Sequence, residues 1–466
     1  MGSDAKFVQL GSLCSQVLTG GTPLTKNKHF YDGGTIPWLK TKEVNFNFIE
    51  STENYITEAG LAGSSAKLVP VNSVIVAMYG QGDTAGRVAV NKIPVTTNQA
   101  CCNLVIDPLK ADYRFVYYYL KSSYSELVRR KTGSAQPNLN TKILKDFEIV
   151  DLPLARQTAI GDQLEALDQK ITLNRQINQT LEQMAQTLFK SWFVDFDPVM
   201  DNALDAGNPI PDELQHRAEA RKAVREGFKS LPDEVRQLFP DAFEESELGW
   251  VPKGWETKPI SSLINLIGGG TPKTSEESYW GGEIPWFSVV DAPNDSNVFV
   301  LDTEKKVTEA GVANSSTKVL RVGTTIISAR GTVGKCALVA TPMAMNQSCY
   351  GVVGAEGVHD YFVYYLLRQS VKQLQQRSHG SVFSTITRDT FSSLKLATGN
   401  VSLTQLFGNT ISPWFEKILA NNQQQSSLER LRDTLLPKLI SGELRLDDVE
   451  LAVEQEAVSA EQQNER

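Results

Sequence analysis

The chain has 466 residues, of which 41% are hydrophobic and 21% are charged, an ordinary composition for a soluble globular protein. No apolar run approaches the roughly 18 to 20 residues of a membrane-spanning helix, and the first residues lack the apolar core of a signal peptide, so we expect a cytoplasmic protein without membrane contact. The five cysteines include no Cys-x-x-Cys and the four histidines are scattered, which argues against disulfides and against a metal site.

Acidic residues are concentrated in two segments. Residues 195–250 hold 14 acidic and 6 basic side chains, and residues 443–466 hold 8 acidic and 2 basic ones. The rest of the chain is therefore mildly basic, although the formal net charge is −8. Binding to DNA is compatible with this distribution, because affinity depends on local neutralisation of phosphates. Solvating linkers and tails explain the acidic residues equally well.

The sequence repeats itself at a distance of about 248 residues. The matching segments are Gly20–Pro23 with Gly269–Pro272, Gly33–Trp38 with Gly281–Trp286, Thr57–Gly60 with Thr308–Gly311, Ser64–Lys67 with Ser315–Lys318, Asn98–Gln99 with Asn346–Gln347, and Phe115–Tyr118 with Phe362–Tyr365. A repeat of this length indicates a duplicated domain and not a solenoid unit.

The predicted elements follow the same order in both copies, and the predicted fold class is α+β. Residues 1–152 form a mixed α/β domain with a β-rich stretch at Ser73–Met78 and a helix over 112–130, and segment 153–194 holds a long helix over about 156–191. Residues 195–248 form an acidic linker or insert. Residues 249–399 repeat the domain, with a β-rich stretch at Thr324–Ala329 and a helix over 360–377, and segment 400–442 repeats the long helix over about 403–440. Residues 443–466 are predicted to be an acidic, disordered tail.

Both long helices carry a stripe at alternating spacings of four and three, which is typical of a coiled coil. In the first helix the stripe is Ile160, Leu164, Leu167, Ile171, Asn174, Asn178, Leu181, Ala185 and Leu188; in the second it is Phe407, Ile411, Trp414, Ile418, Asn421, Gln425, Leu428, Arg432 and Leu435. Two amphipathic helices, each packed on its own domain, are the alternative. The polar residues at matching positions favour two helices that pack on each other.

We find no catalytic set and expect no catalytic residue, no metal and no cofactor in this chain. The Asn/Asp-Pro-Pro-aromatic run of amino-methyltransferases is absent. The run Gly268–Thr274 ends like a phosphate-binding loop, but Pro272 stands where that motif requires Gly and contributes no N–H. The spacing of Asp241, Glu256 and Lys258 resembles a nuclease site, but it has no counterpart in the first copy.

Two aligned segments carry cations and amides that suit DNA. The glycine loop Tyr79–Arg87 aligns with Arg330–Lys335, and a cation-rich segment from Arg129 aligns with one from Gln376. Cations followed by Gln, Asn and Thr suit phosphate positioning and base-edge reading, whereas a hairpin turn and a solvated helix end are the alternatives. The candidate DNA-binding residues are Lys40, Lys42, Tyr79, Gln81, Arg87, Arg129, Lys131, Gln136, Asn138, Asn140, Ser288, Arg330, Lys335, Arg377, His379, Thr385 and Thr387.

The motifs together resemble the specificity subunit of Type I restriction-modification systems. They are Gly-Gly-Thr-Pro, Ile-Pro-Trp, Thr-Glu-Ala-Gly, Arg-Gly-Thr-Val-Gly-Lys and Asn-Gln, with Phe189–Pro198 after the first long helix and Leu435–Leu444 at the end of the second. The resemblance implies two target recognition domains joined by an antiparallel helix pair, with each domain reading one half of a split, asymmetric DNA site. In such a pair we expect Asn174 and Asn421 to lie near each other, and the pair to act as a spacer between the half-sites.

The resemblance also implies which partners perform the chemistry. They are two methyltransferase subunits that modify adenine N6 with S-adenosylmethionine, and up to two restriction subunits that use ATP and Mg²⁺. A non-catalytic interaction scaffold or an acidic decoy of a DNA-binding complex is the alternative, and a self-sufficient nuclease fits the sequence less well.

Overall fold

The structure is a computed structural model that describes residues 6–80, 82–132, 138–225, 231–293, 297–377, 385–441 and 443–444. The chain divides into two compact units. The first unit comprises Met1–Leu173 and Gln424–Arg466, and the second comprises Asn174–Gln423. Each unit therefore combines one copy of the repeat with half of each long helix.

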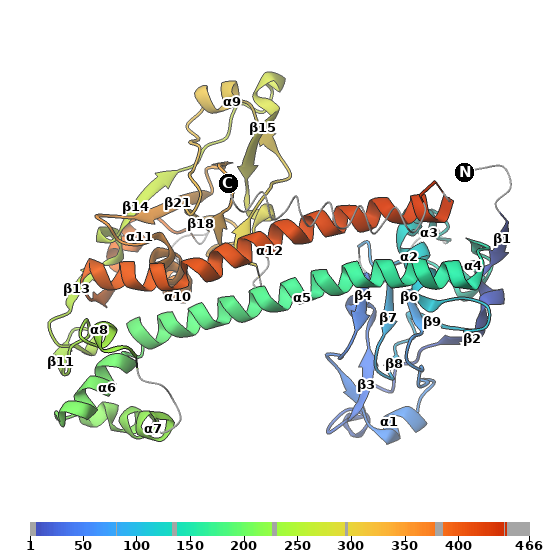
Figure 1. The fold of residues 1–466 in the computed structure, drawn as a ribbon, viewed down its shortest axis with the longest axis horizontal. Helices are drawn as coiled ribbons and strands as arrows, with labels where there is room; N and C mark the ends of the chain where they lie inside the picture. The colour runs from blue at the N-terminus through green and yellow to red at the C-terminus, as the bar shows by residue number, and fades with distance from the viewer. Residues whose placement is uncertain are drawn as a thin grey trace. The chain divides into compact units, whose positions relative to one another are not determined.

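The first unit is built on a five-stranded sheet in the order β2-β9-β6-β7-β4 (Figure 1). The strands are β2 Cys14–Thr19, β9 Cys101–Ile106, β6 Val74–Ala77, β7 Val88–Asn91 and β4 Asn47–Ile49. All neighbours are antiparallel except β4 and β7. Strands β6 and β7 are buried at every position, and all of their residues except Asn91 are β-branched or small and apolar, which favours a buried strand. The β-rich stretch predicted at Ser73–Met78 is confirmed by β6.

A smaller three-stranded sheet in the order β5-β3-β8 accompanies the first. Its strands are β5 Tyr55–Ile56, β3 Ile36–Leu39 and β8 Thr96–Thr97, and β1 Phe7–Gln9 pairs separately with β10 Glu148–Val150. The short helix α1, Glu58–Ala62, begins at Thr57, whose hydroxyl accepts a hydrogen bond from the Gly60 N–H at 3.1 Å. This is the usual N-cap role of threonine.

Three further short helices belong to the first unit. The helix predicted over 112–130 is interrupted at Ser123, so that it forms α2, Tyr113–Ser122, and α3, Tyr124–Arg129. Helix α4, Thr141–Lys145, follows. Helix α2 buries Phe115 and its neighbouring apolar residues in the same core as the five-stranded sheet.

The second unit repeats this architecture. Its five-stranded sheet has the order β14-β21-β18-β19-β16, its three-stranded sheet the order β17-β15-β20, and β13 pairs with β22. The strands are β13 Glu256–Pro259, β14 Ile264–Gly268, β15 Trp280–Phe287, β16 Phe299–Val300, β17 Lys306–Val307, β18 Thr325–Ser328, β19 Cys336–Val339, β20 Ala344–Met345, β21 Cys349–Gly354 and β22 Lys395–Thr398. The helices are α9 Glu309–Ala313, α10 Asp360–Arg377 and α11 Arg388–Ser393. The second β-rich stretch and the helix over 360–377 are confirmed.

The acidic segment is folded onto the second unit. It contains α6 Asp197–Ala206, α7 Gln215–Arg225, α8 Asp233–Arg236 and the hairpin β11 Phe243–Ser246 with β12 Gly249–Pro252 (Figure 1). Its buried residues Val199, Phe239 and Val251 belong to the hydrophobic core of that unit. Several of its acids pair with its own arginines; Arg221, for example, forms a bidentate pair with Asp201 at 2.9 and 2.8 Å.

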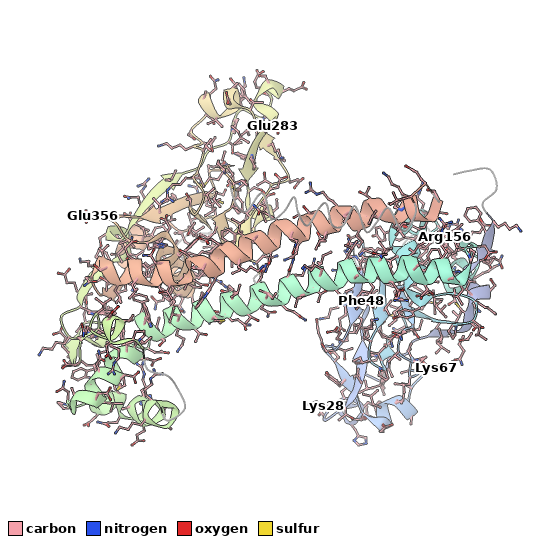
Figure 2. All side chains as sticks on the ribbon, in the orientation of Figure 1. Lys28, Phe48, Lys67, Arg156, Glu283 and Glu356 are labelled. Carbon is pink, nitrogen blue, oxygen red and sulfur yellow. The ribbon has the colours of Figure 1, made fainter. Side chains whose placement is uncertain are left out.

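The two long helices are α5, Leu154–Phe193, and α12, Val401–Ser441. They pair antiparallel within each unit. In the first unit Arg156, near the start of α5 (Figure 2), donates to the Leu439 carbonyl at 2.8 Å. Further along, Arg432 pairs with Asp168 at 2.6 Å. In the second unit Asn178 bonds to Asn422 at 2.7 Å. The seam positions Ile160, Leu164, Leu167, Ile171, Ile411, Ile418 and Leu428 are buried, and Leu181 is partly buried.

Two details of the predicted seam need correction. Phe415 is fully buried, whereas the predicted Trp414 is only partly buried. Asn421 donates to Asn178 at 2.8 Å, one turn along α5 from the predicted partner Asn174. Aromatic packing, which a heptad count does not weigh, contributes to this register: Phe189 packs on Phe407 with ring centroids 5.7 Å apart.

Candidate nucleic-acid interface

The repeated Gly-Gly-Thr-Pro motif is a structural contact in both units. In the first unit the Trp38 indole N–H donates to the Gly21 carbonyl at 3.1 Å, and Thr22 bonds to Gln99. A Cβ at Gly20 would lie 2.1 Å from the Asn98 carbonyl oxygen, so only glycine fits. The motif therefore joins the end of β2 to the strands of the smaller sheet.

The second unit makes the same contacts. The Trp286 indole N–H donates to the Gly270 carbonyl at 3.0 Å, and Thr271 bonds to Gln347. A Cβ at Gly269 would lie 1.9 Å from the Asn346 carbonyl oxygen. Since the same close packing occurs twice, we assign these motifs to the scaffold and not to ligand binding.

The Asn-Gln turn, residues 98–100, lies between two strand ends. The Asn98 N–H donates to the Leu39 carbonyl at the end of β3 at 3.0 Å, and the Met78 N–H, just after β6, donates to the Ala100 carbonyl at 2.8 Å. The Leu139 N–H in turn donates to the Met78 carbonyl at 2.9 Å. Three segments that carry candidate residues therefore converge here: residues 40–49, 79–87 and 129–140, which we call the interface loops of the first unit.

The second unit brings its own three segments together in the same way. The Asn346 N–H donates to the Phe287 carbonyl at 2.9 Å, the Ala329 N–H to the Ser348 carbonyl at 2.7 Å, and the Ile386 N–H to the Ala329 carbonyl at 3.0 Å. Residues 288–299, 330–335 and 377–387 are the interface loops of the second unit. Gln81, Gln136 and His379 belong to these loops but lie outside the described residues.

Arg87 connects two interface loops of the first unit. Its guanidinium donates to the Asn45 side chain at 2.9 Å and to the Asp83 carboxylate at 2.6 Å. The hydrogen bond from Arg87 lowers the pKa of Asp83, and the charge of Lys131 adds a weaker effect in the same direction. Lys131 and Arg87 therefore both act on the same exposed carboxylate. Sequence reasoning missed Asn45 because only its place in a divergent loop distinguishes it.

The glycine loops are packed on helices. The two closing glycines, Gly86 and Gly334, have φ angles of +96° and +91°, which favour glycine. A Cβ at Gly86 would meet the Tyr124 ring at 3.3 Å, and one at Gly334 would meet Val371 at 2.6 Å. The close neighbours of these two glycines are therefore side chains of α3 in the first unit and of α10 in the second.

The remaining candidate residues differ in how far their side chains are engaged. Lys40 donates to Asn54 at 3.1 Å and lies over the Trp38 ring, and Lys42 is exposed and paired with Glu53, which raises the pKa of Lys42. Ser288 donates to Asp291 at 2.9 Å. Tyr79 is partly buried against the core, and burial raises its pKa.

The cation-rich segments combine exposed cations with helix caps. Arg129 and Arg330 are exposed, and Arg377 donates to the Ser393 carbonyl. The Asn140 side chain caps α4 by accepting from the Ile143 N–H at 2.9 Å, and the aligned Thr387 caps α11. Asn138 pairs with Thr132 through backbone hydrogen bonds. The side chains of Asn140 and Thr387, which the sequence suggested for contacts with base edges, therefore cap helices at the ends of their loops.

Buried charges hold each domain on the helix pair. Asp168 of α5 accepts from the Tyr118 hydroxyl at 2.9 Å, pairs with Arg432 at 2.6 Å and lies 4.0 Å from Lys121. In the second unit Glu182 of α5 pairs with Arg368 of α10. Such pairs orient the domains on the helices, since leaving one member unpaired is costly.

Two kinds of feature do not occur in the parts of the chain that the structure describes. No helix among them is long and apolar enough to cross a membrane. No cluster of three or more His, Cys, Asp or Glu residues suited to a metal ion occurs within the same ranges.

A sequence model of the Type I restriction modification DNA specificity domain matches residues 2–183 and 252–430. The two matches correspond to the two copies of the repeat and leave residues 184–251, with the acidic segment, unmatched.

Similar proteins carry the same description. The Type I restriction enzyme HindI specificity subunit of Haemophilus influenzae is 32% identical over 345 residues, 69% of this chain and 74% of that protein. The MjaIX specificity subunit of Methanocaldococcus jannaschii is 25% identical over 442 residues, 93% of this chain and 92% of that protein. The crystal structure of a Type I S subunit from M. genitalium shares the fold, with a TM-score of 0.57 and 17% identity over 94% of this chain and 96% of that one. The chain therefore belongs to the family of Type I restriction-modification specificity subunits, the non-catalytic components that give these systems their DNA sequence specificity.

Proposed function

We propose that this chain reads a bipartite, asymmetric DNA site, one half with the interface loops of each unit. The observation that supports this is a shared scaffold with different loops. The contact between Trp38 and Gly21 recurs between Trp286 and Gly270, whereas residues 40–49 and 288–299 differ in sequence. Different side chains at one structural position present different donors and acceptors to base edges, so the two half-sites differ.

Within each set of loops we assign phosphate contact to the cations. In the first unit these are Arg87, Arg129 and Lys131, and in the second Arg330, Lys335 and Arg377. Amide and hydroxyl groups nearby, such as Asn138 and Thr385, then face base edges. Arg87 reaches a phosphate by exchanging its exposed partner Asp83 for the DNA.

We propose that two methyltransferase subunits and up to two restriction subunits assemble on this chain. The methyltransferases supply adenine-N6 methylation with S-adenosylmethionine, and the restriction subunits supply ATP- and Mg²⁺-dependent cleavage. The 40 residues of α5 extend about 60 Å at 1.5 Å per residue, and the helix pair acts as the spacer between the half-sites.

A domain exchange tests the division of labour. Residues 1–152 are replaced by the first domain of another family member, and methylated adenines are mapped in genomic DNA from cells that carry the partner subunits. We expect one half of the methylated site to change and the other half and the spacer to stay. A change in both halves would show that the units do not read independently.

The salt dependence of duplex binding separates a DNA reader from a scaffold or decoy. Removing one cation that binds a phosphate should reduce the slope of log affinity against log salt by about one, so Arg87→Gln and Lys131→Gln should each flatten it. The control is Lys67→Gln, because Lys67 is exposed on the side of the first unit away from α5, as is Lys28 (Figure 2). A flatter slope for Lys67→Gln alone would place the interface elsewhere.

A further inference from the structure

The second unit contains a pocket of about 180 Å³ at the base of its glycine loop. Its lining includes Asn297 next to β16, Lys335 and Cys336 at the start of β19, and Tyr364, Arg368 and Val371 of α10. Lys335 closes the loop 330–335, so the pocket adjoins the interface loops of the second unit.

In the first unit two aromatic rings occupy the equivalent positions. Strand β4 pairs with β7 in the register in which β16 pairs with β19, so Phe46 corresponds to Asn297. The repeat of the following helix aligns Tyr124 with Val371. The Phe46 and Tyr124 rings meet edge to face, with centroids 5.4 Å apart, and the Tyr124 hydroxyl donates to the Asp83 carbonyl at 2.5 Å. Asparagine and valine are smaller, and the second unit has a pocket instead.

The groups around the pocket favour an anion with several oxygen acceptors. Arg368 uses only Nη1 for its hydrogen bonds to Glu182 and to the Tyr364 hydroxyl, so Nε and Nη2 have no partner among the described residues. Lys335 adds a second cation. Burial raises the pKa of the Cys336 thiol to about 12, so this thiol stays neutral and adds no competing negative charge.

We propose that this pocket binds a phosphate group. On the proposed DNA-reading function, the group is a backbone phosphate of the half-site that the second unit reads. The planar guanidinium of Arg368 can present two N–H donors to phosphate oxygens, and Lys335 acts as a point charge. In the first unit the Phe46 and Tyr124 rings occupy this place. At this place the second unit therefore offers Arg368 as a further phosphate donor beside Lys335, the residue that aligns with Arg87 of the first unit.

The test transplants the aromatic pair into the second unit of the full chain. The variant Asn297→Phe with Val371→Tyr fills the pocket, and Lys335→Gln removes a cation while leaving the pocket open. The probes are duplexes that carry the methylated site, each with one phosphate of the second half-site replaced by an uncharged methylphosphonate. We expect wild-type affinity to fall roughly 3- to 10-fold at one position, and both variants to be insensitive at that position. The salt slope should also fall by about one.

A second arm uses inorganic phosphate without DNA, followed by calorimetry or ³¹P nuclear magnetic resonance on the same full-length proteins. Binding that disappears in both variants, with no methylphosphonate effect, would identify free phosphate as the ligand and would reject the DNA assignment. If wild type and variants behave alike both with the methylphosphonate duplexes and with inorganic phosphate, the phosphate pocket is refuted. If the variant Asn297→Phe with Val371→Tyr fails to fold, the comparison of wild type with Lys335→Gln tests the pocket. The proposed function would be refuted if the wild-type chain showed no specific duplex binding. The measurement with inorganic phosphate would still test whether the pocket binds phosphate.

Discussion

Neighbouring glycines in this fold have different physical roles. Gly268 is exposed and a Cβ there would have no neighbour within 4 Å, whereas the next residue, Gly269, packs directly on the Asn346 carbonyl. The sequence shows both as members of one glycine run. Only the structure separates the residue that the scaffold requires from the one that it tolerates.

We therefore expect opposite results from two alanine substitutions. Gly269→Ala should destabilise the second unit by about 3 kcal/mol, because the backbone around Asn346 must move. Gly268→Ala should be neutral or stabilising by up to about 1 kcal/mol, since it restricts the unfolded chain. Urea unfolding of the full-length proteins measures both. Equal midpoints for the two variants would contradict the steric assignment.

His359 caps the start of α10 in its neutral form. Its Nδ1 accepts from the Tyr361 N–H at 3.1 Å, and burial lowers its pKa below the ordinary 6.5, with Asp360 opposing the shift. In the first unit the aligned Asp112 accepts the corresponding hydrogen bond, from the Arg114 N–H at 2.9 Å. One cap position is thus filled by an imidazole in one unit and by a carboxylate in the other.

This cap predicts a pH dependence of stability. The unfolded histidine takes up a proton near pH 6.5, whereas the folded one does so only at lower pH. Stability contributed by His359 is therefore present above pH 6.5 and is lost as the pH falls from 6.5 to the lowered folded-state pKa. His359→Asn keeps an acceptor for the i+2 N–H and should remove this part of the dependence. Urea midpoints of both proteins are compared between pH 7.5 and 5, and the wild-type midpoint should fall relative to that of His359→Asn as the pH falls; a constant difference would contradict the prediction.

At the scale of elements, the long helices were the most predictable part of the fold. Their periodicity extends over many turns, and the observed ends, Leu154–Phe193 and Val401–Ser441, lie within two residues of the predicted ones. Their register was less predictable. The pairing of Asn421 with Asn178 depends on the packing of large side chains, which a periodic pattern does not encode.

The asparagine cluster of Asn178, Asn421 and Asn422 should govern register more than stability. Asn178→Leu alone leaves two amides without their partner and should destabilise the helix pair by about 1 to 3 kcal/mol. Replacing all three by leucine should restore or exceed the wild-type stability while it weakens the preference for one register. Gln179→Leu, exposed on the same turn of α5, is the control.

Two readouts apply to this series. Urea unfolding measures stability, and mapping of methylated adenines measures the spacer between half-sites. Mixed spacers in the triple variant would support a register role for the cluster. A single unchanged spacer at full activity would assign the register to other seam residues or to the bound methyltransferases.

At the scale of the whole molecule, the sequence predicted the duplicated architecture because two copies of each motif could be compared. The candidate interface was only partly predictable. The aligned cations lie in or beside converging loops, and their contact with DNA stays a prediction. The helix caps Asn140 and Thr387 and the partner Asn45 depend on local hydrogen bonds, which the sequence does not show. The pocket at Asn297 could be recognised only by comparing the two folded units, because it lies where Asn297 and Val371 replace the larger aromatic residues Phe46 and Tyr124.

The acidic segment shows where composition was least informative. The sequence suggested a linker or insert, and the family match stops at residue 183 and resumes at 252. In the structure Phe239 is buried and its ring packs edge to face on Trp192 at 5.4 Å, while Asn202 donates to the Phe239 carbonyl at 3.0 Å. The segment is therefore part of the core of the second unit.

Phe239→Ala should consequently destabilise the second unit by about 3 to 5 kcal/mol, because it removes a buried ring from a packed aromatic cluster. Hydrogen exchange should speed up across the second unit and stay unchanged in the first, whose sheets have a separate core. Leu248→Ala is the matched control, since Leu248 lies in the same segment, is 45% exposed and should change stability by less than about 0.5 kcal/mol. If Phe239→Ala behaved like this control, the segment would be a dispensable covering of the second unit. Faster exchange confined to residues 197–252 would mean that the segment unfolds on its own and that the recognition domain does not depend on it.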